Sequence, residues 1–298
     1  MRLGIDIGGT KTDAVAVDGQ GSVAQRVRLS TGFGQAEVVE TAVTAVTRIG
    51  ELTGLAAAGF DTIGIGIPGM VDRSSGRVAH AVNLGLDRVE LGDLLAGRLG
   101  RGVRLENDVN AAALGAYHVL GLRGSMAYLN LGTGMAAGIV VNGSLWRGAT
   151  GIAGEIGHLP VDPAGELCRC GQRGCLETMA SGSAVARHWP TDDPLPVRAL
   201  FAAAAAGDPE ALAVSAVLAE GIASAVRVLV LTVDVDAVVI GGGLSHLGEP
   251  LLAQVREVLE RWSRTSPFLA SLQLPRRVRL VPEGTPVAAL GAALVGEN

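Results

Sequence analysis

Three cysteines and one histidine form the most distinctive cluster of reactive side chains in the chain. Cys168, Cys170 and Cys175 fall within eight residues, and His158 precedes the first of them by ten positions. Three thiolates and one imidazole can hold zinc in tetrahedral coordination, and four protein ligands leave no open position on the metal. The alternative is three buried or redox-active cysteines beside an unrelated histidine, but such tight clustering favours a structural zinc site.

Carboxylates flank this cluster and also follow an earlier strand. Glu155 and Glu177 lie at the two ends of the cysteine segment, so a bound metal would hold both acids in place. Asp108 follows an apolar strand over residues 103–105, at the end of which open α/β sheets bind ligands. A carboxylate there can accept a proton from a hydroxyl group. Asp108 could also simply cap the helix expected over residues 110–120.

Two glycine turns repeat at an interval of 124 residues. The strand over residues 3–7 leads into Gly8-Gly9-Thr10, and the strand over 129–131 leads into Gly132-Thr133-Gly134. Glycine turns let backbone N–H groups converge on an anion such as a phosphate. A two-residue hairpin is expected after each unit, at Asp18-Gly19 and Asn142-Gly143. The repeat predicts two similar halves, although two ordinary glycine-rich hairpins would share the pattern.

The remaining elements indicate an α/β protein. Apolar residues at helical spacing predict a helix over 35–53, and further helices are expected over 195–206 and 209–232. Gly64-x-Gly66-x-x-Gly69 matches a dinucleotide-binding fingerprint, but Pro68 and the lack of a following helix argue against that function. A buried strand over 237–240 ends in Gly241-Gly242-Gly243, which suits close approach to a planar or bulky ligand. A mobile turn is the alternative for these glycines.

Composition excludes several other classes of protein. The formal charge of −5 argues against a nucleic-acid surface. Clustered cysteines argue against a disulfide framework and favour a reducing compartment. Asp6 interrupts the first apolar segment, and the most apolar region, 222–240, carries Arg227, Asp234 and Asp236. We therefore expect a cytoplasmic protein with no membrane span.

Six short motifs occur in a characteristic order. They are Asp6-Ile-Gly-Gly-Thr10-Lys, Glu106-Asn-Asp108, Gly132-Thr-Gly134, Glu155-Ile-Gly-His158, Cys168-x-Cys170-Gly-x-x-Gly-Cys175-x-Glu177 and Ile240-Gly-Gly-Gly243. This set resembles the ROK family (repressor, open reading frame, kinase), especially its bacterial glucokinase-like members, over nearly the whole chain. The resemblance implies an actin/hexokinase-like (ribonuclease H-like) fold, in which duplicated α/β domains enclose a cleft. Residues 1–115 plus 286–298 would form the smaller domain, and residues 116–285 the larger domain with the zinc loop.

The family resemblance also implies an activity, which is transfer of the γ-phosphoryl group of ATP to the 6-hydroxyl of a hexose. Glucose is the leading substrate, and N-acetylmannosamine kinase and fructokinase are the alternatives within the family. A non-catalytic sugar-sensing regulator is the alternative outside catalysis, but family repressors carry a winged helix-turn-helix before the first glycine turn. Only seven residues precede Gly8 here. A homodimer or homotetramer is expected.

Individual roles follow from the same resemblance. Asp108 would be the catalytic base. The sugar would be bound by Gly69, Asn83, Asn107, Asp108, Glu155, His158 and Glu177. ATP and Mg²⁺ would be bound by Asp6, Gly8, Gly9, Thr10, Lys11, Thr133, Gly134, Gly241, Gly242 and Gly243. His158, Cys168, Cys170 and Cys175 would hold the zinc. The chain departs from the family pattern after the second glycine turn, where Ala136 and Ala137 replace glycines and are expected to narrow the approach to phosphate.

Overall fold

The chain folds into two compact units. The computed structural model describes residues 1–193 and 195–295. The first unit comprises Met1–Arg123, Gly138–Ala153 and Gly284–Asn298, and the second comprises Gly124–Ala137 and Gly154–Glu283. The chain therefore passes between the units four times, and the strand around Gly138 begins in one unit and ends in the other.

A five-stranded sheet forms the centre of the first unit. Its order is β3-β2-β1-β4-β8. The strands are β1 (Arg2–Ile7), β2 (Lys11–Val17), β3 (Val23–Ser30), β4 (Ile63–Ile67) and β8 (Arg104–Asn107). β1, β4 and β8 are parallel, whereas β2 and β3 run antiparallel to their neighbours. Because parallel strands end at the same edge of a sheet, the residues that follow Ile7, Ile67 and Asn107 are brought together there.

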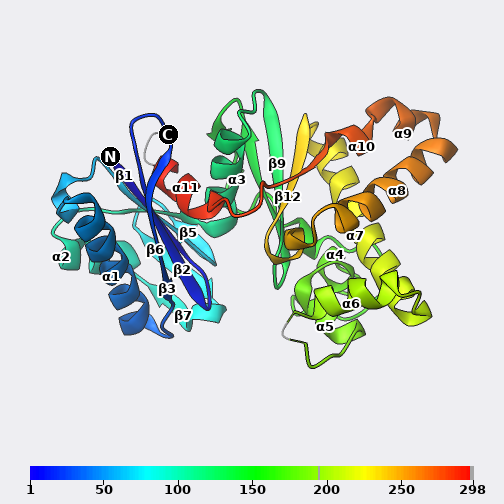
Figure 1. Cartoon of the computed structure of the whole chain (residues 1–298), viewed down its shortest axis with the longest axis horizontal. Coiled ribbons are helices and arrows are strands. Elements are labelled where there is room, and N and C mark those ends of the chain that lie inside the picture. Colours follow the sequence, from blue (N-terminus) through cyan, green and yellow to red (C-terminus); the bar gives the residue numbers. More distant parts are fainter. Residues whose placement is uncertain (194, 296–298) are drawn as a thin grey trace. The chain divides into compact units, whose positions relative to one another are not determined.

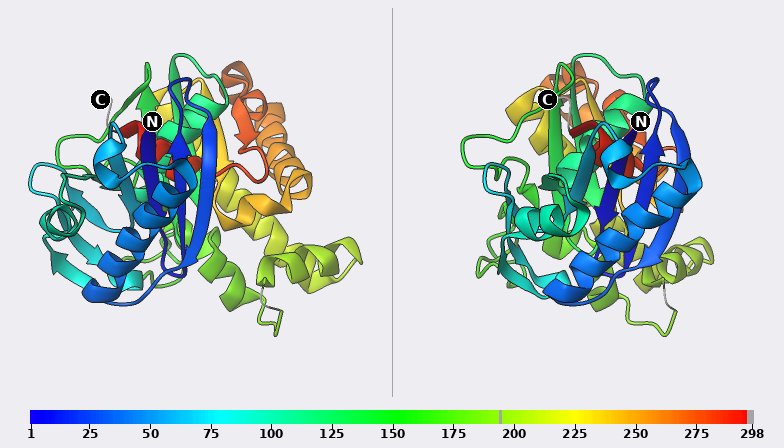
Figure 2. Two further views of the ribbon diagram at one scale, coloured as in Figure 1. Left: turned by 60° about the vertical axis from the view of Figure 1, so that its left-hand side comes forward. Right: turned by 90° about the vertical axis from the view of Figure 1, so that its left-hand side faces the viewer.

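Helices α1 (Gln35–Thr53) and α11 (Val287–Leu294) cover opposite faces of this sheet (Figures 1 and 2). Leu3 and Ile5 point to the face that packs against α1, whose bounds match the prediction. Successive strand residues alternate between faces, so Gly4 points to α11. A Cβ atom at Gly4 would collide with the backbone of Ala289, and α11 therefore packs directly on the strand backbone.

Glycine also permits close contact at the other surface of α11. Helix α3 (Asp108–Val119) packs against it, and a Cβ atom at Gly115 or Gly291 would overlap the backbone of the facing helix. Gly64 of β4 lies equally close to Ala292. The glycines of the fingerprint-like segment 64–69 thus serve packing and turning. Gly69 has a φ of 96°, and a strand follows it rather than a helix.

The remaining elements of the first unit are peripheral. A three-stranded sheet has the order β5-β6-β7. The elements are β5 (Met70–Asp72), β6 (Arg77–Ala81), β7 (Leu86–Val89) and α2 (Leu91–Leu99), with short 3₁₀ turns at Ala57–Gly59 and Val82–Leu84.

The second sheet repeats the first, as the internal duplication predicts. Its order is β11-β10-β9-β12-β13. The strands are β9 (Ser125–Leu131), β10 (Met135–Val141), β11 (Ser144–Leu145), β12 (Ala237–Gly241) and β13 (Val278–Leu280). β9, β12 and β13 are parallel, as β1, β4 and β8 are. Of the two expected hairpins, Asn142-Gly143 is confirmed, with φ values of 50° and 81°.

The hairpin expected at Asp18-Gly19 is wrong. β2 ends at Val17 and β3 begins at Val23, so five residues connect them. The Asp18 carboxylate accepts hydrogen bonds from the backbone N–H groups of Gln20 and Ser22, and Gly21 supplies the positive φ of 84°. This side-chain-capped loop replaces the tighter turn.

Helices pack against the second sheet, and the apolar side chains of both form the core of the second unit. The helices are α4 (Leu176–Met179), α5 (Gly182–His188), α6 (Pro196–Ala205), α7 (Pro209–Val233), α8 (Glu249–Thr265), α9 (Pro267–Leu272) and α10 (Leu274–Arg277), with 3₁₀ turns at Ile156–His158 and Gly243–Leu247. By length and composition alone, α7 could cross a membrane. Half of its most apolar window is buried in the core, and Glu220 and Arg227 interrupt it.

Candidate functional site

The four predicted metal ligands lie together in the second unit. The side-chain donor atoms of His158, Cys168, Cys170 and Cys175 are all within 4.8 Å of one another. Sγ of Cys170 lies 3.6 Å from Sγ of Cys175, and Sγ of Cys168 lies 3.7 Å from Nδ1 of His158. A tetrahedral zinc with Zn–S bonds of about 2.3 Å separates two sulfurs by about 3.8 Å. The cluster is therefore compatible with a structural zinc, and its sulfurs are too far apart for a disulfide.

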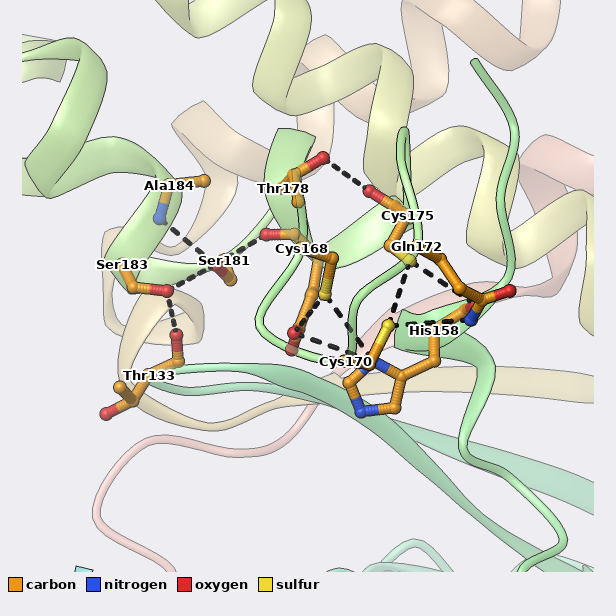
Figure 3. Close-up of polar contacts among 11 residues, drawn as sticks. Thr133, His158, Cys168, Cys170, Gln172, Cys175, Thr178, Ser181, Ser183 and Ala184 are labelled. Atoms are coloured by element: carbon orange, nitrogen blue, oxygen red, sulfur yellow. Dashed lines mark hydrogen bonds and ion pairs between the residues drawn. The ribbon is translucent and has the colours of Figure 1, made fainter. Parts of the chain in front are cut away.

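A short loop brings the cysteines into this arrangement. The backbone N–H of Cys168 donates to the carbonyl of Gln172 (2.7 Å), and Gly171 turns the chain with a φ of 90°. The Gln172 amide donates to the carbonyl of His158 (3.1 Å), which fastens the loop to the segment that carries the imidazole. Figure 3 shows the His158 ring and the three sulfur atoms turned toward one another.

Glu177 lies against the cluster, at the start of α4. Its Oε1 is 3.1 Å from Sγ of Cys168 and 3.6 Å from Nδ1 of His158. Its other oxygen lies beside the second glycine turn, where a Cβ atom at Gly134 would be only 3.0 Å away. Burial raises the pKa of Glu155. His158 opposes this increase, and the negative charge of Glu177 adds to it. The second unit thus brings Glu155, His158 and Glu177 together beside the cluster.

The first glycine turn gathers predicted residues in the first unit. The backbone N–H of Gly8 donates to the carbonyl of Lys11 (2.9 Å), which closes the turn between β1 and β2. A Cβ atom at Gly9 would be 3.2 Å from Cβ of Asn83, so these two residues are neighbours. The Thr10 carbonyl accepts from the N–H of Thr31 (3.1 Å).

At the junction of β8 and α3, the structure assigns the helix cap to Asn107. The Asn107 Oδ1 atom accepts from the N–H groups of Val109 (2.9 Å) and Asn110 (3.1 Å), and its Nδ2 donates to the carbonyl of Gly69 (3.2 Å). Asp108 is the first residue of α3, and its Oδ1 accepts from the N–H of its neighbour Val109 (3.0 Å). The capping function proposed for Asp108 therefore belongs to its neighbour.

Asp6 lies close to Asp108. Burial, followed by the charges of Asp108 and Asp13, raises the pKa of Asp6 to about 8. A bound divalent cation would offset the repulsion between these carboxylates and favour the ionised form of Asp6. Carboxylate oxygens are ligands that Mg²⁺ prefers, so the residues present fit the predicted magnesium site.

This raised pKa predicts a pH-dependent effect of Asp6→Asn. The folded protein binds the Asp6 proton more tightly than the unfolded chain does, so the free energy of unfolding falls as pH rises from about 4 to about 8. One unit of pKa shift corresponds to about 1.4 kcal/mol, so even half of the rise in the pKa of Asp6 would lower the free energy of unfolding by roughly 3 kcal/mol. In Mg²⁺-free buffer, Asp6→Asn should therefore melt above the wild type at pH 8 in calorimetry, and this advantage should shrink toward pH 4.

Asp18→Asn is the matched control for this effect. Hydrogen bonds from the backbone N–H groups of Ser22 and Gln20 lower the pKa of Asp18. Replacement of this carboxylate by an amide should therefore lower the melting temperature at pH 8. Parallel melting curves for Asp6→Asn and the wild type across this pH range would contradict the raised pKa of Asp6.

Sequence reasoning missed a buried charge network beside Asn107. The Glu106 side chain is 3% exposed, and its Oε2 accepts from Nε (2.9 Å) and Nη2 (2.7 Å) of Arg147. Its Oε1 accepts from the N–H of Asn107 (3.1 Å) and from Nδ2 of Asn110 (3.2 Å). A lone acid at the end of a buried strand is the sequence feature that could have indicated such a network. Nothing in the sequence pairs it with Arg147.

The three glycines at the end of β12, Gly241 to Gly243, have different environments. A Cβ atom at Gly241 would overlap Tyr128, and Gly242 has a φ of 81° and lies against Leu131. Only Gly243 has open space beside its Cα. Internal packing therefore explains two of these glycines, and their predicted contact with the nucleotide stays a prediction.

The alanines near the second glycine turn lie within β10. Ala137 is buried in the core of the second unit, and Ala136 occupies the opposite face of the strand. The Ala137 methyl group therefore points into the protein core, and only Ala136 remains as a candidate for narrowing the approach to phosphate.

Comparison with known proteins gives a consistent result. The sequence model of the ROK family matches residues 2–295. A glucokinase of Streptomyces coelicolor is 32% identical over 285 residues, 88% of each chain. An N-acetylmannosamine kinase of Haemophilus influenzae is 32% identical over 264 residues, 87% of this chain and 85% of the relative. The solved ROK family glucokinase from Streptomyces griseus, in complex with glucose and AMPPNP, has a TM-score of 0.81 at 31% identity and covers 99% of this chain and 98% of its own. These matches confirm the expected fold, and the chain belongs to the ROK family.

Proposed function

We propose that this protein is an ATP-dependent kinase that phosphorylates a hexose, with glucose as the preferred substrate, at the 6-hydroxyl. The observation that carries the proposal is the edge of the first sheet, where Asp108 follows β8 close to Asp6 and the first glycine turn. A carboxylate that follows a parallel strand and lies close to a second acid suits proton transfer next to a phosphate site.

In the proposed mechanism, the Asp108 carboxylate accepts the proton of the attacking sugar hydroxyl. Such general base catalysis is worth roughly 10²–10⁴-fold in rate. The backbone N–H groups of the glycine turns orient the phosphates, since phosphoryl transfer depends mainly on positioning and charge neutralisation. Mg²⁺, when bound near Asp6, would neutralise phosphate charge. Asn107 holds the start of α3, and with it Asp108, through its bonds to Val109 and Gly69.

Specificity for the sugar is proposed to come from side chains that hydrogen-bond its hydroxyls. In the first unit these are Asn83 and Asn107, with the backbone at Gly69. In the second unit they are Glu155, His158 and Glu177, which the proposed zinc site holds in place. Nδ1 of His158 faces the cysteine sulfurs, so its Nε2 is left for a hydroxyl group. A site with such donors and acceptors discriminates strongly against sugars that lack the matching hydroxyl.

N-acetylmannosamine kinase is the second candidate. The Haemophilus influenzae relative with this name is as similar to the chain, at 32% identity, as the Streptomyces coelicolor glucokinase. The acidic charge and the free cysteines further support a cytoplasmic enzyme under either assignment.

A panel of sugars tests the proposal. Purified protein is supplied with ATP and Mg²⁺ and with glucose, mannose, fructose, N-acetylglucosamine or N-acetylmannosamine, and ADP release is followed. Glucose should give a kcat/KM at least tenfold above the others, and coupling to glucose-6-phosphate dehydrogenase should detect the product. A higher kcat/KM for N-acetylmannosamine would support the second candidate, and no turnover of any sugar would refute a kinase.

A further inference from the structure

The N-terminal end of α5 is fastened to the second glycine turn. The N–H of Gly182 donates to the carbonyl of Gly132 (2.8 Å). The carbonyl of Thr133 accepts two hydrogen bonds from Ser183, one from its N–H (3.1 Å) and one from its Oγ (2.7 Å). Figure 3 shows the Ser183 side chain directed at Thr133. Both carbonyls of the turn thus point toward Gly182 and Ser183.

This direction fixes where the N–H groups of the turn point. In a planar trans peptide, the N–H points opposite to the C=O of the preceding residue. The N–H of Thr133 is therefore directed away from Gly182, and the N–H of Gly134 is directed away from Ser183. Neither N–H donates a hydrogen bond within residues 1–193 and 195–295. The turn thus offers two parallel donors on the side away from α5, an arrangement that suits an anion.

Ser183 also lies beside the segment that carries Glu177. Its Oγ lies 3.1 Å from Oγ of Ser181, which is fully buried and donates to the carbonyl of Glu177 (2.7 Å). Ser181 also caps α5, because its Oγ accepts from the N–H of Ala184 (3.1 Å). Since Ser181 supplies the cap, α5 does not need the Ser183 hydroxyl for that purpose.

We propose that Ser183 is a positioning residue for the phosphoryl donor, acting through the Thr133–Gly134 peptide that it orients. The inference rests on the proposed kinase function and assigns to Ser183 no contact with substrate. Its hydroxyl holds the peptide plane so that the Gly134 N–H points at the phosphate.

Ser183→Ala tests this proposal. The variant keeps the N–H bond to Thr133 and loses the Oγ bond, so the peptide is free to rotate. We expect the KM for ATP to rise about fivefold to tenfold, the scale of one lost hydrogen bond, while the KM for the sugar stays within twofold. Titration calorimetry with AMPPNP and Mg²⁺ should show the same loss of affinity without turnover. Ser183→Thr retains the hydroxyl and should restore nucleotide affinity.

Ser215→Ala is the matched control. Ser215 is a buried serine of the same unit, and its hydroxyl also donates to a backbone carbonyl, that of Leu212 (3.1 Å). Its loss should lower the melting temperature about as much as Ser183→Ala does, with an unchanged KM for ATP.

The other outcomes separate the inference from the proposed function. An active wild type with an unchanged KM for ATP in Ser183→Ala would overturn the role of Ser183 and leave the kinase assignment standing. A fall in kcat with both KM values unchanged would also overturn it, because it would indicate a general loss of structure. A wild type that binds no nucleotide and phosphorylates no sugar would overturn both.

Discussion

Asp108→Asn is expected to lower kcat by about 10²–10⁴-fold. The amide has nearly the same size as the carboxylate but cannot accept the proton of the attacking hydroxyl. It can still accept the hydrogen bond from the N–H of Val109, so the start of α3 should remain intact. Sugar affinity should change little, because Asn retains hydrogen-bonding capacity. Steady-state kinetics would measure kcat, and calorimetry would measure sugar binding in the absence of ATP.

Asp208→Asn is a suitable control for this substitution. Asp208 is also an acid at a helix start, where it caps α7 by accepting from the N–H groups of Glu210 (2.9 Å) and Ala211 (2.9 Å). Because no role in catalysis is proposed for Asp208, its substitution should leave kcat unchanged. If Asp108→Asn retained a kcat within tenfold of the wild type, Asp108 could not be the general base.

The second large effect is expected from disruption of the cysteine cluster. Metal analysis of the purified wild type should find about one zinc per chain, and Cys175→Ser should lose it. Cys175 is fully buried, and its loss leaves three ligands for a site that needs four. The loop that fixes His158 and Glu177 should then become mobile, so the KM for the sugar should rise more than tenfold and the melting temperature should fall. The KM for ATP should change less.

His188→Gln provides the control beside the same loop. His188 contacts Glu166, which lies in the zinc loop but outside the ligand set. This variant should keep its zinc and its KM for the sugar. A wild type that is metal-free and fully active would refute the structural zinc, whatever the variants show.

The sequence predicted most of the framework, because the framework depends on local periodicity. Helix α1 was expected over residues 35–53 and spans Gln35–Thr53, since its apolar positions recur at helical spacing. The duplication predicted two similar halves, and each half contains a five-stranded sheet with the corresponding strand order. The hairpin at Asp18 failed for a local reason as well. A dipeptide favours a two-residue turn, but a carboxylate that bonds to two nearby N–H groups stabilises a longer one.

The interactions that position the candidate residues could not be predicted. They join residues that are far apart in the sequence, and hydrophobic periodicity indicates only local structure. Arg147 pairs with Glu106 across 41 positions, and Ser183 bonds to Thr133 across 50. Asn107 and Asp108 are adjacent and both are favoured at helix starts, so sequence alone could not tell which one caps α3. The motifs identified candidate site residues, whereas the residues that hold these candidates in place could be identified only from the fold.

The dependence of the first sheet on α11 has a consequence for synthesis on the ribosome. α3 ends at Val119 and α11 ends at Leu294, so about 175 further residues must be translated before α11 can cover Gly4, Gly64 and Gly115. At a translation rate of about 5–20 residues per second, this delay lasts roughly 10–35 s. During that time, the face of the nascent N-terminal sheet that α11 covers in the folded protein stays exposed. Synthesis of the first unit therefore begins before that of the second, but its fold is completed last.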